Sequence, residues 1–149
     1  MNRISCISAL FWVAMASIGP AIAQDNVGRA TVVRGAVVQA PPGQNADSLG
    51  QGGAVFRSAV IKSGSGAAAE LTFADSSKAT LSSDSELIID EFVYSGPGAA
   101  ANQTVTFAKG SFRFVSGLVP KQNVTLRTPT VTLGIRGTTL IIVVRPDGS

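Results

Sequence analysis

Apolar and polar residues alternate along most of the chain after its first apolar run, in short segments separated by glycine, serine, asparagine, aspartate and proline. In the stretch ELIIDEF, for example, Leu87 and Ile89 fall on one face, whereas Glu86 and Asp90 fall on the other. Alternation with a period of two is the pattern of a strand with one buried face, and no stretch shows the longer period of a helix convincingly. The pattern predicts an all-β fold of roughly ten short strands.

The segments between these strands indicate a single domain that extends from residue 24 to residue 149. Two longer stretches, 41–53 and 95–102, lack periodicity and are rich in turn-forming residues, and each is too short to link two separately folding units. We therefore interpret both as surface loops. The similar strand-turn-strand spacing favours a chain that wraps in short rungs, in a β-solenoid-like or sandwich-like manner, rather than in long hairpins.

One arginine interrupts the apolar run TPTVTLGIRGTTLIIVV near the C-terminus. Strand alternation places Val131, Leu133 and Ile135 toward the core, and it places Arg136 on the opposite face. The glycine that follows this arginine allows the backbone to bend before a final strand, 138–144, which is apolar on both faces. We interpret Arg136 as a corner residue whose guanidinium binds turn carbonyls or a nearby carboxylate, in preference to a ligand site.

The first 23 residues have the pattern of a secretory signal peptide. One basic residue, Arg3, precedes an apolar run, and an Ala-Ile-Ala motif ends at Ala23. We expect cleavage after Ala23 and a mature chain, beginning at Gln24, that is periplasmic or secreted and has no membrane span. An uncleaved membrane anchor is the less favoured alternative, because the apolar core is short and a cleavage motif follows it.

The composition narrows the chemistry that is available to the mature chain. Histidine is absent, and the single cysteine, Cys6, lies in the predicted signal peptide. Catalysis by Ser-His-Asp or Cys-His groups is therefore excluded, as are the usual imidazole and thiolate metal sites. We expect no enzymatic activity, no metal and no other cofactor. The formal net charge is +3 and the basic residues are scattered, so we expect no nucleic-acid partner.

A pair of carboxylates offers the main catalytic alternative. Glu86 and Asp90 share one strand face and could form a hydrolase site for an envelope polysaccharide, or a calcium site. A solvated strand face is the favoured interpretation, because no Asp-rich loop with a suitably placed glycine accompanies them. The segment Ser76-Ser77-Lys78 lacks the spacing of a serine-lysine nucleophile, and we interpret it as a hairpin turn.

The last strand is the main candidate for a binding surface. The apolar segment TLIIVV is followed by RPDGS, a turn signal that normally reverses the chain into another strand. If no strand follows, the main chain around Leu140, Ile142 and Val144 presents unpaired N–H and C=O groups, to which a partner strand can be added. The alternative is that the sequence is truncated before its last strand. Self-association through this edge is also left open.

The motif TPTVTLGIRGT, together with VGRATVVRGAV, IKSGSGAAAELTFADSSKATLSSDSELIIDEF and GSFRFVSG, resembles the FecR domain over residues 27–144. Its signature positions are Thr128, Pro129, Gly134, Arg136, Gly137 and Thr138. The resemblance implies an all-β periplasmic domain that is wound somewhat like a short solenoid. In FecR regulators, such a domain relays a signal from an outer-membrane TonB-dependent transporter and controls an extracytoplasmic-function sigma factor.

This chain departs from the regulator design at its start, because only three residues precede the apolar run, where regulators carry a cytoplasmic segment. It resembles instead the stand-alone exported FecR-domain proteins. We therefore expect a non-catalytic binding, sensor or scaffold domain of the cell envelope, whose partner is an envelope protein or a surface polymer. The alternative is a periplasmic module that modulates a separate membrane-bound anti-sigma regulator. Ser76 stands where the family tends to have glycine, so a turn that requires positive φ would be strained there.

Overall fold

The computed structural model describes residues 24–146, so the predicted signal peptide and the last three residues of the predicted C-terminal turn lie outside the described residues. The described chain is built from twelve β-strands and one short 3-10 helix, which confirms the all-β prediction. The elements are β1 (Asn26–Arg34), β2 (Val37–Ala40), β3 (Asp47–Ser48), β4 (Ala54–Phe56), β5 (Val60–Ser63), β6 (Ala68–Phe73), β7 (Lys78–Leu81), β8 (Glu86–Tyr94), β9 (Ala101–Val115), η1 (Lys121–Asn123), β10 (Val124–Arg127), β11 (Thr132–Gly134) and β12 (Thr139–Val144). Within this part of the chain, no helix could span a membrane.

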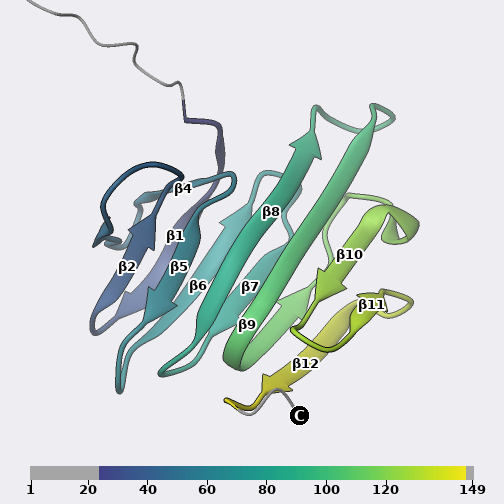
Figure 1. Cartoon of the computed structure of the whole chain (residues 1–149). Helices are drawn as coiled ribbons and strands as arrows, with labels where there is room; N and C mark the ends of the chain where they lie inside the picture. Colours follow the sequence, from purple (N-terminus) through teal and green to yellow (C-terminus); the bar gives the residue numbers. More distant parts are fainter. Residues whose placement is uncertain (1–23, 147–149) are drawn as a thin grey trace, which may run out of the picture.

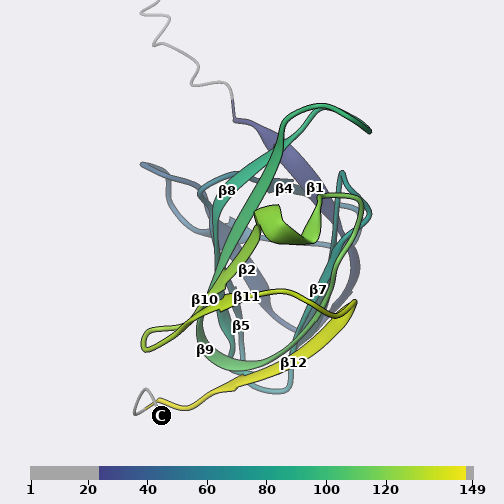
Figure 2. The same ribbon diagram turned by 90° about the vertical axis from the view of Figure 1, so that its right-hand side faces the viewer.

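The strands form one curled, mainly antiparallel sheet that closes around the core as a half-barrel (Figure 1 and Figure 2). Its main path runs in the order β3-β2-β5-β8-β9-β7-β6-β1-β4, so β9 stands in the middle and joins the two sides of the curl. The first part of β9 also pairs in parallel with β10, which in turn pairs with β11. The second part of β9 pairs antiparallel with β12. The C-terminal strands therefore extend both sides of the curl at one end of the molecule.

The chain passes repeatedly from one side of the curl to the other, and four of these crossings lie at the lower end of the half-barrel in Figure 1. β1 continues into β2, β5 into β6 and β7 into β8 across turns of two to four residues. β9 makes the fourth crossing without interruption at Gly110, whose φ of 104° favours glycine. The short strands between these crossings correspond to the short rungs that the sequence predicts. Neighbouring strands on each side of the curl run antiparallel, apart from β9 and β10. β9, with 15 residues, is longer than the strands we expected.

The hydrophobic core is centred on three aromatic side chains that β9 supplies from both of its parts. The ring centroid of Phe107 lies 4.7 Å from that of Phe112 and 6.4 Å from that of Phe114. All three side chains are buried between the two sides of the curl. Because full burial of such a side chain contributes about 1.5–3 kcal/mol, β9 supplies a large share of the core's stability as well as its connectivity.

The turn between β6 and β7 contains Ser76 at a φ of 66°, which confirms the expected backbone strain. Glycine has no Cβ to disfavour this conformation, so Ser76→Gly is expected to raise the free energy of unfolding by about 0.5–1 kcal/mol, as measured by urea denaturation. Ser76 is exposed, so little packing is lost. The control is Ser65→Gly, at an exposed turn residue without positive φ, which should give no gain. An equal gain in both variants would contradict the strain argument.

Candidate functional site

The signature motif spans a turn, β11 and the loop that leads to β12, at the C-terminal end of the half-barrel (Figure 1). Thr128 closes the turn at both ends: its N–H donates to the Val131 carbonyl at 2.8 Å, and its hydroxyl oxygen accepts from the Val131 N–H at 3.1 Å. Pro129 occupies the tip of this turn, where a missing N–H removes no ladder hydrogen bond. The motif therefore fixes the hairpin between β10 and β11.

The alternation predicted for this motif holds only in part. Ile135 is buried and Leu133 is half-buried, whereas Val131 is 49% exposed. The prediction that Val131 points to the core is wrong, because this residue belongs to the turn and β11 begins only at Thr132. Moreover, β11 pairs with β10 alone, so it covers only the margin of the core.

Arg136 lies in the loop between β11 and β12, at a corner of the chain, and its side chain is exposed. In the described part of the chain, the ion pairs and side-chain hydrogen bonds involve other residues, so neither the tie to a carboxylate nor the tie to turn carbonyls that we expected for Arg136 is present there. The side chain instead borders a shallow hollow that is also lined by Lys121, Gln122, Gly134 and Ile135. Two cationic side chains and no carboxylate line this hollow, which makes it electropositive.

The last strand, β12, pairs with the second part of β9 through one edge, with Ile141 opposite Arg113. Ile142 and Val144 are each 6% exposed and Leu140 is half-buried, so these three candidate side chains pack on the core. The alternate residues point outward, and Ile141 is 79% and Val143 62% exposed. Within residues 24–146, β12 has no second partner strand. Its outer edge and its two outward apolar side chains therefore form one continuous open surface.

The other strands that end the sheet are much shorter than β12. β3 has two residues, and β4 and β11 have three each, whereas β12 has six. Natural proteins usually protect a long edge strand with charges, proline or a bulge, and β12 carries no charged residue and no proline. Among the edges of the described sheet, β12 is thus the one with the length and composition to accept another strand.

The acidic residues that the sequence suggests as a catalytic pair have separate local partners. Glu86 forms an ion pair with Lys62 at 3.3 Å, and Asp90 accepts a hydrogen bond from the Thr106 hydroxyl at 2.6 Å. The register of β8 on β9 shifts between Ile89 and Glu91, so a bulge displaces Asp90 along the strand. Within residues 24–146, no group of three potential metal-binding side chains comes together.

A buried polar cluster that the sequence analysis did not identify joins the β6–β7 turn to the segment after β9. Asp75 is fully buried, and its Oδ1 accepts from the Ser77 N–H at 3.1 Å and from the Ser77 hydroxyl at 2.5 Å. Its Oδ2 accepts from the Val119 N–H at 3.3 Å, and Gln103 Nε2 donates to Ser77 Oγ at 3.0 Å. A Cβ at Gly117 would lie 2.2 Å from the Asp75 carbonyl oxygen, so glycine is required for this approach. These contacts give Asp75 a structural role.

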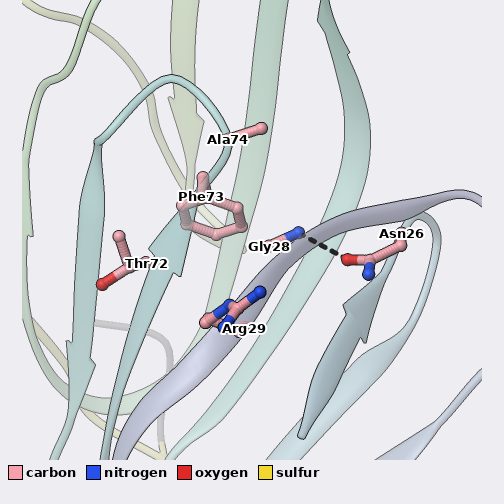
Figure 3. Close-up of a pocket in the computed structure, with 6 residues that line it drawn as sticks. All are labelled: Asn26, Gly28, Arg29, Thr72, Phe73 and Ala74. Carbon is pink, nitrogen blue, oxygen red and sulfur yellow. Dashed lines mark hydrogen bonds between the residues drawn. The ribbon is translucent and has the colours of Figure 1, made fainter. Parts of the chain in front are cut away.

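A second hollow lies where β1 passes β6 (Figure 3). Gly28 comes so close to β6 that a Cβ there would lie 2.4 Å from the Thr72 carbonyl oxygen, and its N–H donates to Asn26 Oδ1 at 3.0 Å. Arg29 is the one charged side chain among the lining residues drawn in Figure 3, which also include Phe73. With a single charged side chain in its lining, the hollow brings no pair of catalytic groups together.

Six of the thirteen charged residues in residues 24–91 form ion pairs with one another. The ammonium of Lys78 donates to Glu70 at 3.1 Å and holds the pKa of Glu70 below its ordinary value; Thr31 and Arg113 act in the same direction, and burial opposes them. Arg57 pairs with Asp25 at 2.5 Å. Exposed pairs of this kind each contribute about 0–1 kcal/mol, so their main consequence is local charge balance.

Over residues 24–146, the fold and this site define an all-β half-barrel domain with one long open sheet edge. The chain belongs to the FecR protein family, whose model matches residues 59–149. FecR domains are associated with iron-dicitrate sensing regulators and are generally non-catalytic. The match includes β5 to β12 and the signature motif, and β1 to β4 lie before it. No curated protein and no solved structure matches the chain.

Proposed function

We propose that this chain is an exported, non-catalytic binding domain of the cell envelope, which acts as a sensor or scaffold by engaging another envelope protein at the edge of β12. The observation that carries the proposal is β12 itself, an uncharged six-residue edge strand with Ile141 and Val143 exposed. Exposed apolar side chains on an open edge favour strand addition, in which main-chain hydrogen bonds provide affinity. This mode favours a protein over a surface polymer as the partner.

Three further observations support the proposal. The apolar run and Ala-Ile-Ala motif before Gln24 favour export and cleavage after Ala23. The sequence has no histidine, and the carboxylates Glu86 and Asp90 have separate local partners, which argues against a hydrolase. Membership of the FecR family is consistent with a role in binding or signalling.

A second candidate function is the modulation of a separate membrane-bound anti-sigma regulator of a TonB-dependent transport system. The observation that favours it is the association of the FecR family with iron-dicitrate sensing regulators. In this function, the partner is the periplasmic part of such a regulator. The two candidates therefore differ in the identity of the bound protein, which one experiment can establish.

The test is photo-cross-linking in the native host, with a photoreactive amino acid in place of Ile141, which is 79% exposed at the centre of β12. The matched control carries the probe at Asn45, an exposed residue of the loop between β2 and β3. We expect a discrete heterologous product from position 141 and none from position 45. Mass spectrometry of the product then separates a regulator from another envelope protein.

Other outcomes would overturn parts of the proposal. If position 141 gives no product, or gives the same products as position 45, β12 is not a binding edge. A product that contains only this chain would replace the envelope partner with a second copy. Recovery of the chain in the cytoplasm with residues 1–23 still attached would remove the claim of export.

A further inference from the structure

We infer that β12 binds an extended acidic segment of its partner, which adds to the sheet as a strand beside β12. This inference rests on the proposed function, because it names the chemistry of the partner at the same edge. It is drawn from the distribution of charge around β12, together with the length and exposure of that strand.

Charge is divided unequally between the two parts of the chain. Residues 24–91 contain eight acidic and five basic residues, whereas residues 92–149 contain six basic residues and one acidic residue, Asp147, which lies outside the described residues. The six are Lys109, Arg113, Lys121, Arg127, Arg136 and Arg145, and all are exposed. The three ion pairs of the described structure all lie within residues 24–91. Lys109 and Arg113 lie on β9, near Glu86 and Glu70, so the positive charge at the end of the half-barrel that carries β10 to β12 comes mainly from Lys121, Arg127, Arg136 and Arg145.

Three of these basic residues surround β12. Arg136 precedes the strand by three positions, Arg145 follows it directly, and Arg113 on β9 lies opposite Ile141 in the register. A strand added to the free edge would thus contact apolar side chains at its centre and meet arginines near both ends. Acidic residues flanking a short apolar or β-branched centre complement this arrangement. The same charges would speed encounter with an acidic segment.

A second copy of the chain fits the same edge less well. If two β12 strands paired antiparallel about a two-fold axis, Arg145 of one copy would approach the segment that contains Arg136 of the other. Like charges placed near one another across a strand pair are destabilising. The outward side chains, Ile141 and Val143, would be buried in such a dimer, and each end of the interface would carry arginines together with Asp147. A partner segment with acidic residues at both ends would complement the arginines more fully than a second copy would.

The inference can be tested with a synthetic peptide and the purified exported chain. The probe is a fluorescent peptide of about eight residues, with two glutamates at each end and alternating valine and threonine between them. Its counterpart has lysine in place of each glutamate. We expect the acidic peptide to bind with a Kd of about 10–100 μM in low salt, with at least tenfold weaker binding of the lysine peptide. Fluorescence anisotropy measures both, and raising the salt to about 0.5 M should weaken the acidic complex severalfold.

Two matched pairs of variants locate the site. Arg136→Glu should weaken binding of the acidic peptide about tenfold, whereas Arg34→Glu, at an exposed arginine at the end of β1, should leave it unchanged. Ile141→Lys should also weaken binding, because it places a charge on the apolar centre of β12, whereas Val32→Lys on the exposed face of β1 should not. Circular dichroism of each variant checks that the fold is retained.

Several results would overturn the inference. The inference is wrong if the acidic peptide does not bind at about 1 mM, or if the lysine peptide binds equally well. It is also wrong if Arg136→Glu and Arg34→Glu change binding of the acidic peptide to the same extent. Dimerisation that Ile141→Lys abolishes would assign the edge to a second copy. Cross-linking from position 141 distinguishes failure of the inference from failure of the proposed function. If a heterologous partner is joined through a segment without acidic residues, the proposed function stands and the inference is wrong.

Discussion

Gly110→Ala is expected to lower the free energy of unfolding by about 3–5 kcal/mol, which is a large fraction of the stability of a domain of this size. Two effects combine at this position. Its φ of 104° is unfavourable for any residue with a Cβ, and a Cβ there would lie 2.6 Å from the Ser85 Cα and 2.1 Å from the Ser85 hydroxyl oxygen. The backbone of β9 or of the β7–β8 turn would have to move. Urea denaturation monitored by circular dichroism measures the change.

Gly96→Ala provides the matched control for this variant. Gly96 has a similar φ of 120°, but no heavy atom lies within 4 Å of the position that a Cβ would occupy. Only the unfavourable φ destabilises this variant, so we expect its free energy of unfolding to fall by about 1–2 kcal/mol. If the two variants lose the same stability, the close approach of Gly110 to Ser85 has no energetic importance, and the corner of β9 is more adaptable than its geometry indicates.

Asp75→Ala is expected to lower the free energy of unfolding by about 3 kcal/mol or more. The substitution removes the acceptor for two N–H groups and one hydroxyl, from Ser77 and Val119, and each buried donor left without a partner costs about 1–3 kcal/mol. The segment after β9 loses its attachment to the β6–β7 turn. We expect faster amide exchange at Val119 than in the wild-type chain, in addition to the loss measured by denaturation.

The control for Asp75 is Asp90→Ala, at an exposed carboxylate with a hydrogen bond to Thr106. Because water can replace this bond, a change within about 0.5–1 kcal/mol is expected. Asp75→Asn separates charge from hydrogen bonding, since the amide keeps one acceptor oxygen. Equal effects of Asp75→Ala and Asp90→Ala would show that the buried cluster does not hold the two segments together.

The strands could be predicted from the sequence where one face is buried and the other is polar. Leu87 and Ile89 are fully buried, and their neighbours on β8 are not. The pairing of strands could not be predicted, because alternation identifies which face is buried and does not identify the neighbour. The parallel pair of β9 and β10 is an example, since nothing in the local pattern distinguishes it from a hairpin.

The final strand could be located from the sequence, but the orientation of its side chains could not. The strand is apolar on both faces, so alternation does not distinguish the outward residues Ile141 and Val143 from the inward residues Ile142 and Val144. The role of Asp75 could not be predicted, because its partner Val119 lies 44 residues away. The positive φ at Ser76 could be anticipated, because the family that the sequence resembles tends to have glycine at this position of the turn.

The central position of β9 has a consequence for folding kinetics. This one strand pairs with β7, β8, β10 and β12, so neither side of the curl is complete until residues 101–115 are in place. Long-range pairing of this kind slows folding, because the chain must close large loops before the contacts that stabilise them can form. A nascent chain that ends before β9 would therefore lack the one strand that joins the two sides, so the half-barrel can close only late in synthesis.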